Sequence, residues 1–144
     1  MQPPGQERYA QAASRHLQDA KLLLAHGRYD NAVYLSGYVA ECCLKAVIEQ
    51  FATTVAARRY GHDLRSLRRA LVLYPRAEAY IPAEVIERTA LVRGHPHRRY
   101  WPSGAWSAAE AADIVGLADR IHQQTVARLV LHGLLRKEDL DGAG

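Results

Sequence analysis

The residues best suited to chemistry lie in one short segment, residues 93–106, RGHPHRRYWPSGAW. It holds a dense set of basic and aromatic side chains: Arg93, His95, His97, Arg98, Arg99, Tyr100, Trp101 and Trp106. Arginines bind phosphates through charge-assisted hydrogen bonds, histidines transfer protons near neutral pH, and aromatic rings stack on bases. The segment could therefore contact a phosphate, a nucleotide or RNA. Alternatively, the arginines are solvated and the tryptophans cover one end of the fold.

A second group consists of Tyr34, Tyr38, Glu41 and Lys45. Their spacing of i, i+4, i+7 and i+11 places them on one face of a helix. The surrounding stretch, residues 28–51, is apolar at nearly every other angle, which indicates a helix buried on most sides. The simplest interpretation is an ordinary ion pair between Glu41 and Lys45. The functional interpretation is that the strip faces the same cleft as the 93–100 loop.

Basic charge is concentrated in the middle of the chain. The 144 residues carry a formal charge of +4, but residues 58–100 hold ten arginines against four acidic residues. This distribution suggests a phosphate-bearing or acidic partner, although a solvated arginine-rich surface would look the same. With 49% hydrophobic and 24% charged residues, the chain is globular rather than disordered. Its length predicts a single domain over residues 1–144.

Several functional classes are disfavoured by composition. No apolar run approaches the ~18 residues of a membrane-spanning helix, and the first residues, MQPPGQER, lack the apolar stretch of a secretion signal. The cysteines, Cys42 and Cys43, are adjacent and poorly placed to bond to each other. We therefore expect a cytoplasmic protein that does not associate with membranes.

A metal site is not apparent from the sequence. His95 and His97 could offer two nitrogens to zinc, but the sequence identifies no third ligand, and the cysteines are better explained as small core residues. We expect neither a metal nor another cofactor.

Helical periodicity predicts an all-α fold that begins with a helical hairpin. A first helix over residues 7–26 is followed by Gly27, which suits the left-handed cap. The short turn makes the second helix, residues 28–51, antiparallel to it, with Asp30 or Asn31 as its cap.

The remaining elements are predicted from start and stop signals. His62 or Asp63 can cap a third helix, Pro82 suits the first turn of a fourth that ends by Gly94, and Ser107 with Glu110 forms a capping box for a last helix that runs to about residue 135. Residues 1–6 and 136–144 are expected to fray. The predicted fold is an up-down four-helix bundle plus a short extra helix.

These motifs together resemble the HEPN domain (higher eukaryotes and prokaryotes nucleotide-binding). The resemblance rests on GRYDNAVYLSGY at residues 27–38, ECCLKA at 41–46, GHDL at 61–64 and the Arg99-Tyr100 pair before the last helix. It spans roughly residues 7–131. It implies a bundle of four or five helices, usually a homodimer, in bacterial toxin–antitoxin or defence systems.

The resemblance implies two alternative functions. One is a nucleotide- or RNA-associated binding and interaction module, partnered with a nucleotidyltransferase. The other is a metal-independent endoribonuclease of the toxin type, with Arg93 and His97 as catalytic residues. In either case the residues expected to contact phosphate, RNA or nucleotide are Glu41, Lys45, His95, Arg98, Arg99 and Tyr100.

The nuclease signature of the family is an arginine followed, after four to six intervening residues, by a histidine near the start of the last helix. Here the formal match is Arg88 with His95, which straddles Gly94. The binding module is therefore the main expectation and the endoribonuclease its alternative.

Overall fold

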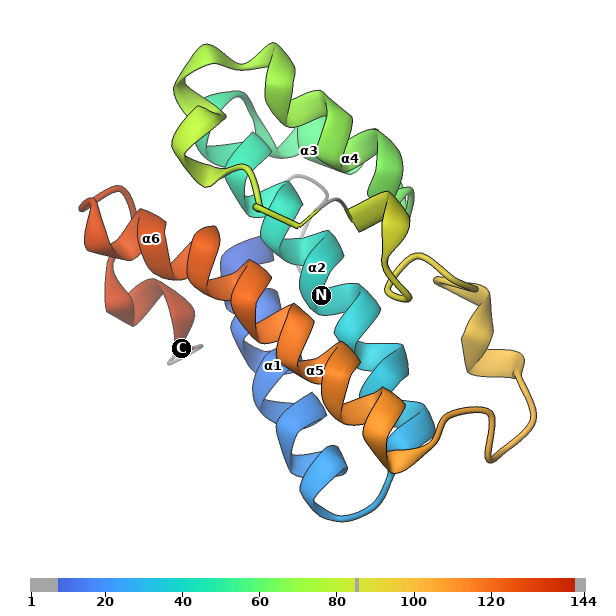
Figure 1. Ribbon diagram of the computed structural model, residues 1–144. Coiled ribbons are helices and arrows are strands. Elements are labelled where there is room, and N and C mark those ends of the chain that lie inside the picture. Colours follow the sequence, from blue (N-terminus) through green and yellow to red (C-terminus); the bar gives the residue numbers. More distant parts are fainter. Residues whose placement is uncertain (1–7, 85, 142–144) are drawn as a thin grey trace.

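Three long helices form the body of the protein, α1 (Tyr9–Ala25), α2 (Tyr29–Phe51) and α5 (Ala108–Gln124). The computed structural model describes residues 8–84 and 86–141. The three helices lie side by side, and α2 contacts both others (Figure 1). The described residues contain no strand, so the expected all-helical bundle is confirmed.

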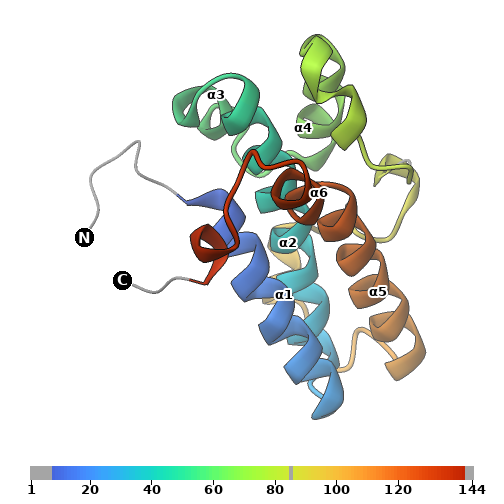
Figure 2. The same ribbon diagram turned by 90° about the vertical axis from the view of Figure 1, so that its left-hand side faces the viewer.

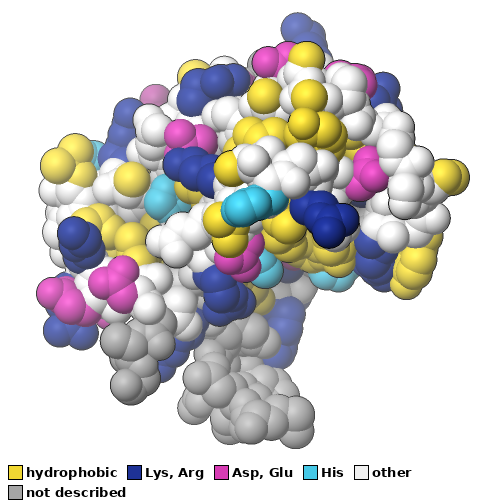
Figure 3. Space-filling model, turned by 90° about the horizontal axis from the view of Figure 1, so that it is seen from below, with side chains coloured by type: hydrophobic (Ala, Val, Ile, Leu, Met, Phe, Trp, Pro, Cys, Tyr) yellow, Lys and Arg dark blue, Asp and Glu magenta, His cyan; other side chains and the backbone are white. Residues whose placement is uncertain are grey.

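Short helices surround this body. Figure 2 shows α3 (Thr54–Arg58) and α4 (Leu64–Ala70) gathered at one end, with α6 (Val126–Leu131) continuing from α5. Five 3₁₀ turns complete the described chain: η1 (Leu71–Leu73), η2 (Pro75–Tyr80), η3 (Ile86–Arg88), η4 (His97–Tyr100) and η5 (Lys137–Leu140). Viewed from the end that carries the α1–α2 turn, the surface mixes basic, acidic and apolar side chains (Figure 3).

The core is built around α2, as its all-round apolar pattern predicts. Most of its side chains between Ala32 and Ile48 are buried, and Leu44, Val47 and Ile48 are completely inaccessible to solvent. Small residues on the neighbouring helices, such as Ala13 and Ala118, are also fully buried. A helix buried on most sides leaves little surface for polar groups. The charged side chains of Glu41 and Lys45 on this helix therefore need polar partners within the protein.

Two predicted elements differ in the structure. The prediction of a helix between Pro82 and Gly94 is wrong, because the described residues there form only η3 and turns. Thr89 donates its hydroxyl to the carbonyl of Ile86 at 2.8 Å, a local bond that competes with helical pairing. The last helix divides into α5 and α6 at Thr125, whose hydroxyl bonds to the carbonyl of Ile121 where the backbone leaves helical geometry.

The ends of the chain were expected to fray. Residues 1–6 lie outside the described residues. Residues 136–141 include η5, which packs against α1, and Leu140 is partly buried against the core. An apolar contact therefore holds residues 137–140 against the body of the protein, and residues 142–144 lie outside the described residues.

Most helix caps match the expected residues. Asp63 caps α4 by accepting from the backbone N–H groups of Arg65 and Ser66, and Ser107 and Glu110 form the predicted capping box of α5. The cap of α2 was predicted wrongly, because neither Asp30 nor Asn31 precedes the helix; Arg28 does, without a side-chain cap. Asp30 instead accepts from the backbone N–H groups of Gly104 at 2.7 Å and Trp106 at 3.3 Å.

The Asp30 contacts can be tested by mutation. Asp30→Ala removes the acceptor of two backbone N–H groups and should lower the free energy of unfolding by about 1–2 kcal/mol, measured by urea denaturation. Asn31→Ala is the control, because Asn31 is exposed beside it on the same helix. Equal losses in the two variants would show that the Asp30 contacts contribute nothing.

Candidate functional site

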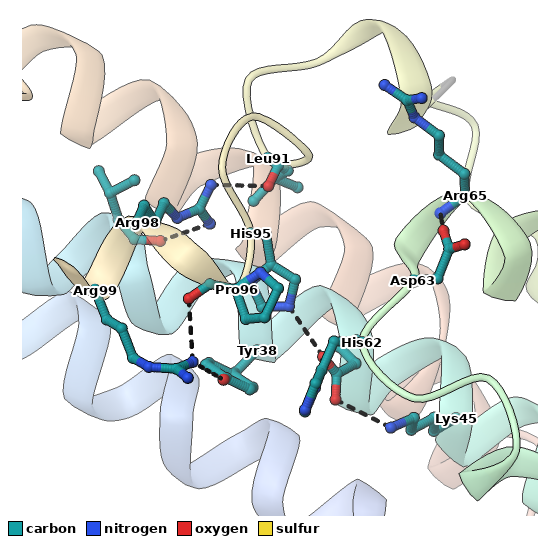
Figure 4. Close-up of polar contacts among 12 residues, drawn as sticks. Tyr38, Lys45, His62, Asp63, Arg65, Leu91, His95, Pro96, Arg98 and Arg99 are labelled. Carbon is teal, nitrogen blue, oxygen red and sulfur yellow. Dashed lines mark hydrogen bonds and ion pairs between the residues drawn. The ribbon is translucent and has the colours of Figure 1, made fainter. Parts of the chain in front are cut away.

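Glu41 is the centre of a polar cluster buried against α2. Its Oε1 lies 2.9 Å from His62 Nδ1 and 2.9 Å from His95 Nε2, and Lys45 Nζ lies 3.0 Å from its Oε2. Figure 4 shows Lys45, His62 and His95 converging from three parts of the chain. Because an ionised carboxylate only accepts hydrogen bonds, both histidines must carry their N–H on the nitrogen that faces Glu41.

Burial differs sharply within this cluster. The side chains of Glu41, Lys45 and His95 are 5%, 6% and 1% exposed, whereas that of His62 is 55% exposed. A charged carboxylate is stable in such a place only when charge and hydrogen bonds compensate for lost water. The ammonium of Lys45 and the two imidazoles supply this compensation, so the predicted ion pair is part of a larger buried network.

The environment determines the charge state of the cluster. Burial opposes ionisation of Glu41, but the hydrogen bond from His95, the charge of Lys45 and the hydrogen bond from His62 together hold its pKa below the ordinary value. Burial lowers the pKa of His95 and outweighs the opposite influence of Glu41. Near neutral pH the cluster therefore combines an ionised carboxylate with a neutral His95.

Tyr38 lies against the two histidines. Its ring centroid is 4.8 Å from that of His95 and 5.8 Å from that of His62, both in edge-to-face geometry. Burial, the neighbouring Tyr34 and the charge of Glu41 raise the pKa of Tyr38 to about 12. The hydroxyl therefore stays protonated, and it accepts a long hydrogen bond of 3.5 Å from Arg99 (Figure 4).

Arg98 positions the loop that carries His95. Its guanidinium is buried and donates to the carbonyls of Leu91 at 2.9 Å, Arg93 at 3.0 Å and Val33 at 3.0 Å. Burial lowers its pKa to about 10, so it remains charged at neutral pH. The bond to Val33 fixes the loop to α2, and Gly37 permits this close approach because a Cβ there would overlap Arg98 Nη2 and His95 Nδ1.

A cavity of about 490 Å³ opens beside the cluster. It lies between the residues that lead into α4 and the loop before η4. Its lining residues are Tyr60, His62, Asp63, Leu64, Arg65, Val92, His95, Pro96 and His97. Two histidines of the Glu41 cluster thus share the cavity with the exposed His97 and with the basic side chain of Arg65.

The predicted site residues fall into two groups. Glu41, Lys45 and His95 are brought together, which confirms that the α2 strip meets the 93–100 loop. Arg98 was expected to contact phosphate, but its donors point to backbone carbonyls and it is only 5% exposed.

The other loop residues face outward. The guanidinium of Arg93 lies 4.6 Å from the ring centroid of Trp106, and Arg93 is not among the residues that line the cavity with His97. Arg99 stacks on Tyr100 at 4.6 Å, and Tyr100 is 75% exposed. Arg93 and His97 therefore do not line one cavity, whereas His97 and His62 do.

His62 is the residue that sequence reasoning undervalued. It was considered only as a cap for the third helix, a role that Asp63 fills. The relevant signal was the GHDL stretch at residues 61–64, in which one polar residue caps and its neighbour is free to turn toward α2.

A family model, the HEPN domain, matches residues 6–129. The chain belongs to the HEPN domain family. Searches of curated proteins and of solved structures gave no match. The range matched by the HEPN model includes the Glu41 cluster, Arg98 and every residue that lines the cavity. Among the described residues, no helix is both long and apolar enough to cross a membrane.

Removing the carboxylate of Glu41 should destabilise the HEPN domain. Glu41→Gln leaves the ammonium of Lys45 buried without its counter-charge, which should lower the free energy of unfolding by roughly 3 kcal/mol at pH 7. Glu138→Gln, at an exposed carboxylate in η5, should cost less than about 0.5 kcal/mol.

The same comparison has a defined pH dependence. Because the pKa of Glu41 is lowered in the folded state, its charge contributes fully above its ordinary value of 4.5. The difference between wild type and Glu41→Gln should therefore shrink as pH falls below 4.5 through the folded pKa. Urea denaturation between pH 3 and pH 7 measures it, and a difference that grew in acid would contradict the assignment.

Proposed function

We propose that this HEPN domain is a nucleotide- or RNA-binding interaction module of a bacterial toxin–antitoxin or defence system, and that its binding site is the cavity beside Glu41. The observation that carries the proposal is the composition of the cavity wall. Its volume of about 490 Å³ lies within the usual range for small-ligand sites. Arg65 and His97 offer donors to a phosphate, while Tyr60, Val92 and Pro96 offer surface to a base or sugar.

A path for a longer ligand continues from the cavity. Tyr38 contacts His95 at the edge of the cavity and accepts from Arg99, whose guanidinium lies over Tyr100. Exposed tyrosine and arginine planes are surfaces on which unpaired bases stack. A single strand could place one nucleotide in the cavity and the next against Tyr100.

Protein partners are part of the proposal. A homodimer and a nucleotidyltransferase partner both require contact surface, and large apolar side chains are exposed outside the cavity. They include Leu22 on α1, Val72 and Leu73 on η1, and Leu131 on α6. None of these four lines the proposed ligand site, so a partner could cover them while the cavity stays open.

The second candidate function is a metal-independent endoribonuclease, and His62 favours it. A buried carboxylate holds one ring nitrogen of His62 while more than half of the side chain stays exposed in the cavity. A histidine oriented in this way could transfer a proton at a ribose hydroxyl. Arg65 or His97 could stabilise charge on the phosphate. This arrangement replaces Arg93 with His62 as the partner of His97.

Binding should depend on the basic residues of the cavity. Arg65→Ala and His97→Ala should each weaken binding of a short labelled single-stranded RNA by about tenfold, because each removes a donor to phosphate. Fluorescence anisotropy at fixed salt in EDTA measures this. Lys137→Ala, which removes an exposed charge in η5, is the control. Equal losses in all three variants would mean unspecific charge attraction and would contradict a site in the cavity.

The same samples separate the two functions. Incubation of an RNA pool with purified protein in EDTA should leave the RNA intact if the domain only binds. Cleavage that is lost in His62→Ala and His97→Ala but kept in His26→Ala, at an exposed histidine next to the α1–α2 turn, would establish the endoribonuclease instead. Cleavage unchanged in all three variants would indicate a contaminating nuclease.

A further inference from the structure

We propose that Glu41, His62 and His95 form a binding site for a divalent transition-metal ion with the ligand preference of Zn²⁺. Each residue offers one ligand atom, and these atoms all lie within 4.8 Å of one another. They come from the middle of α2, the turn before α4 and the loop before η4, and Figure 4 shows His62 close to His95. Two imidazole nitrogens and one carboxylate oxygen are a ligand set that binds zinc while keeping a position open.

The present distances require only a small adjustment. Glu41 Oε1 lies 2.9 Å from each histidine nitrogen, whereas ligands bonded to zinc at about 2.0–2.1 Å in a tetrahedron stand roughly 3.3 Å apart. Glu41 and His95 are held by the core, but His62 is 55% exposed and comes from a turn. Rotation of His62 can adjust the distances from its own nitrogen to the other two ligand atoms, whereas Glu41 Oε1 and His95 Nε2 must separate by roughly 0.4 Å within the core.

Metal binding would require His95 to change its tautomer, because Nε2 carries its proton toward Glu41 in the present structure. Coordination through Nε2 requires the ring proton to be on Nδ1. His95 Nδ1 is buried and has no hydrogen-bond partner among the described residues, so an N–H placed there would be unpaired and should lower the affinity of the site. Lys45 occupies only Oε2 of Glu41 and leaves Oε1 to the histidines. Its positive charge should make the site weaker than a structural zinc site.

The open coordination positions of a bound ion would face the cavity. His62 and His95 both line the 490 Å³ cavity, so water or an oxygen atom of a ligand could reach an ion held between them. Such an ion would polarise an oxygen ligand as a Lewis acid. This inference uses the geometry of the cluster and does not depend on RNA binding, which the preceding experiments examine in EDTA.

The test is titration of the purified chain, residues 1–144, after chelator treatment, with Zn²⁺ by calorimetry and with Co²⁺ by absorption. We expect one equivalent per chain and the visible bands of tetrahedral cobalt without thiolate charge transfer. We also expect a rise in Tm with Zn²⁺, because an ion that binds the folded state stabilises it.

Two variants identify the ligands. His62→Ala should lower affinity at least about tenfold, and it removes an exposed side chain, so folding should persist. His26→Ala is the control, because His26 is exposed next to the α1–α2 turn and lies outside the cluster, and its affinity should match the wild type. The proposal is overturned if the wild type binds no ion, if His62→Ala binds as tightly as wild type, or if cobalt spectra show cysteine ligation. RNA binding that persists in EDTA would leave the proposed function intact in each of these cases.

Discussion

The ionised carboxylate of Glu41 is the constraint on which the arrangement of this HEPN domain depends. It lies in the middle of the most buried helix, where a charge without partners would be very costly. The fold meets this cost by bringing an ammonium from the same helix and two imidazoles from distant segments to its two oxygens. The turn before α4 and the loop before η4 are therefore held next to each other, and the cavity lies between them.

A second charged group acts on the same loop in a different way. Arg98 has no ion-pair partner among residues 8–84 and 86–141; it bonds to carbonyl oxygens of its own loop and of α2. Glu41 thus fixes the end of the His95 side chain while Arg98 fixes the backbone that carries it. A histidine held from both directions keeps little rotational freedom, unlike His62, which is held at one nitrogen and is largely exposed.

The sequence predicted the long helices well because their signals are local. Apolar periodicity, Gly27 and the Ser107–Glu110 capping box each act within a few residues, and α1, α2 and α5 follow them. The segment from Pro82 to Gly94 was predicted wrongly because a few apolar residues at helical spacing do not outweigh local bonds such as that of Thr89. Asp30 was assigned to a cap for a similar reason, since its actual partners lie more than seventy positions away in the chain.

The sequence predicted the part of the site on α2 but not all of the residues that meet it, because only the first depends on local spacing. The helical spacing of Tyr38, Glu41 and Lys45 gives one face directly, but which distant side chains meet that face is decided by tertiary packing. His95 was included because it lay in a conspicuous basic loop, and His62 was passed over because its neighbour Asp63 explained the local structure. Arg98 looked like a ligand contact for the opposite reason: nothing local shows that an arginine will be buried.

Arg98 also affects which substitutions the loop over residues 91–98 could accept. Its guanidinium recognises backbone carbonyls, which every amino acid supplies, and it does not depend on the identity of the side chains at those positions. The path of residues 91–98 is thus largely separated from their side-chain chemistry. Substitutions at Val92 or His97 would alter the wall of the cavity without altering the support of the loop. Ligand preference could therefore change by single substitutions on an unchanged scaffold.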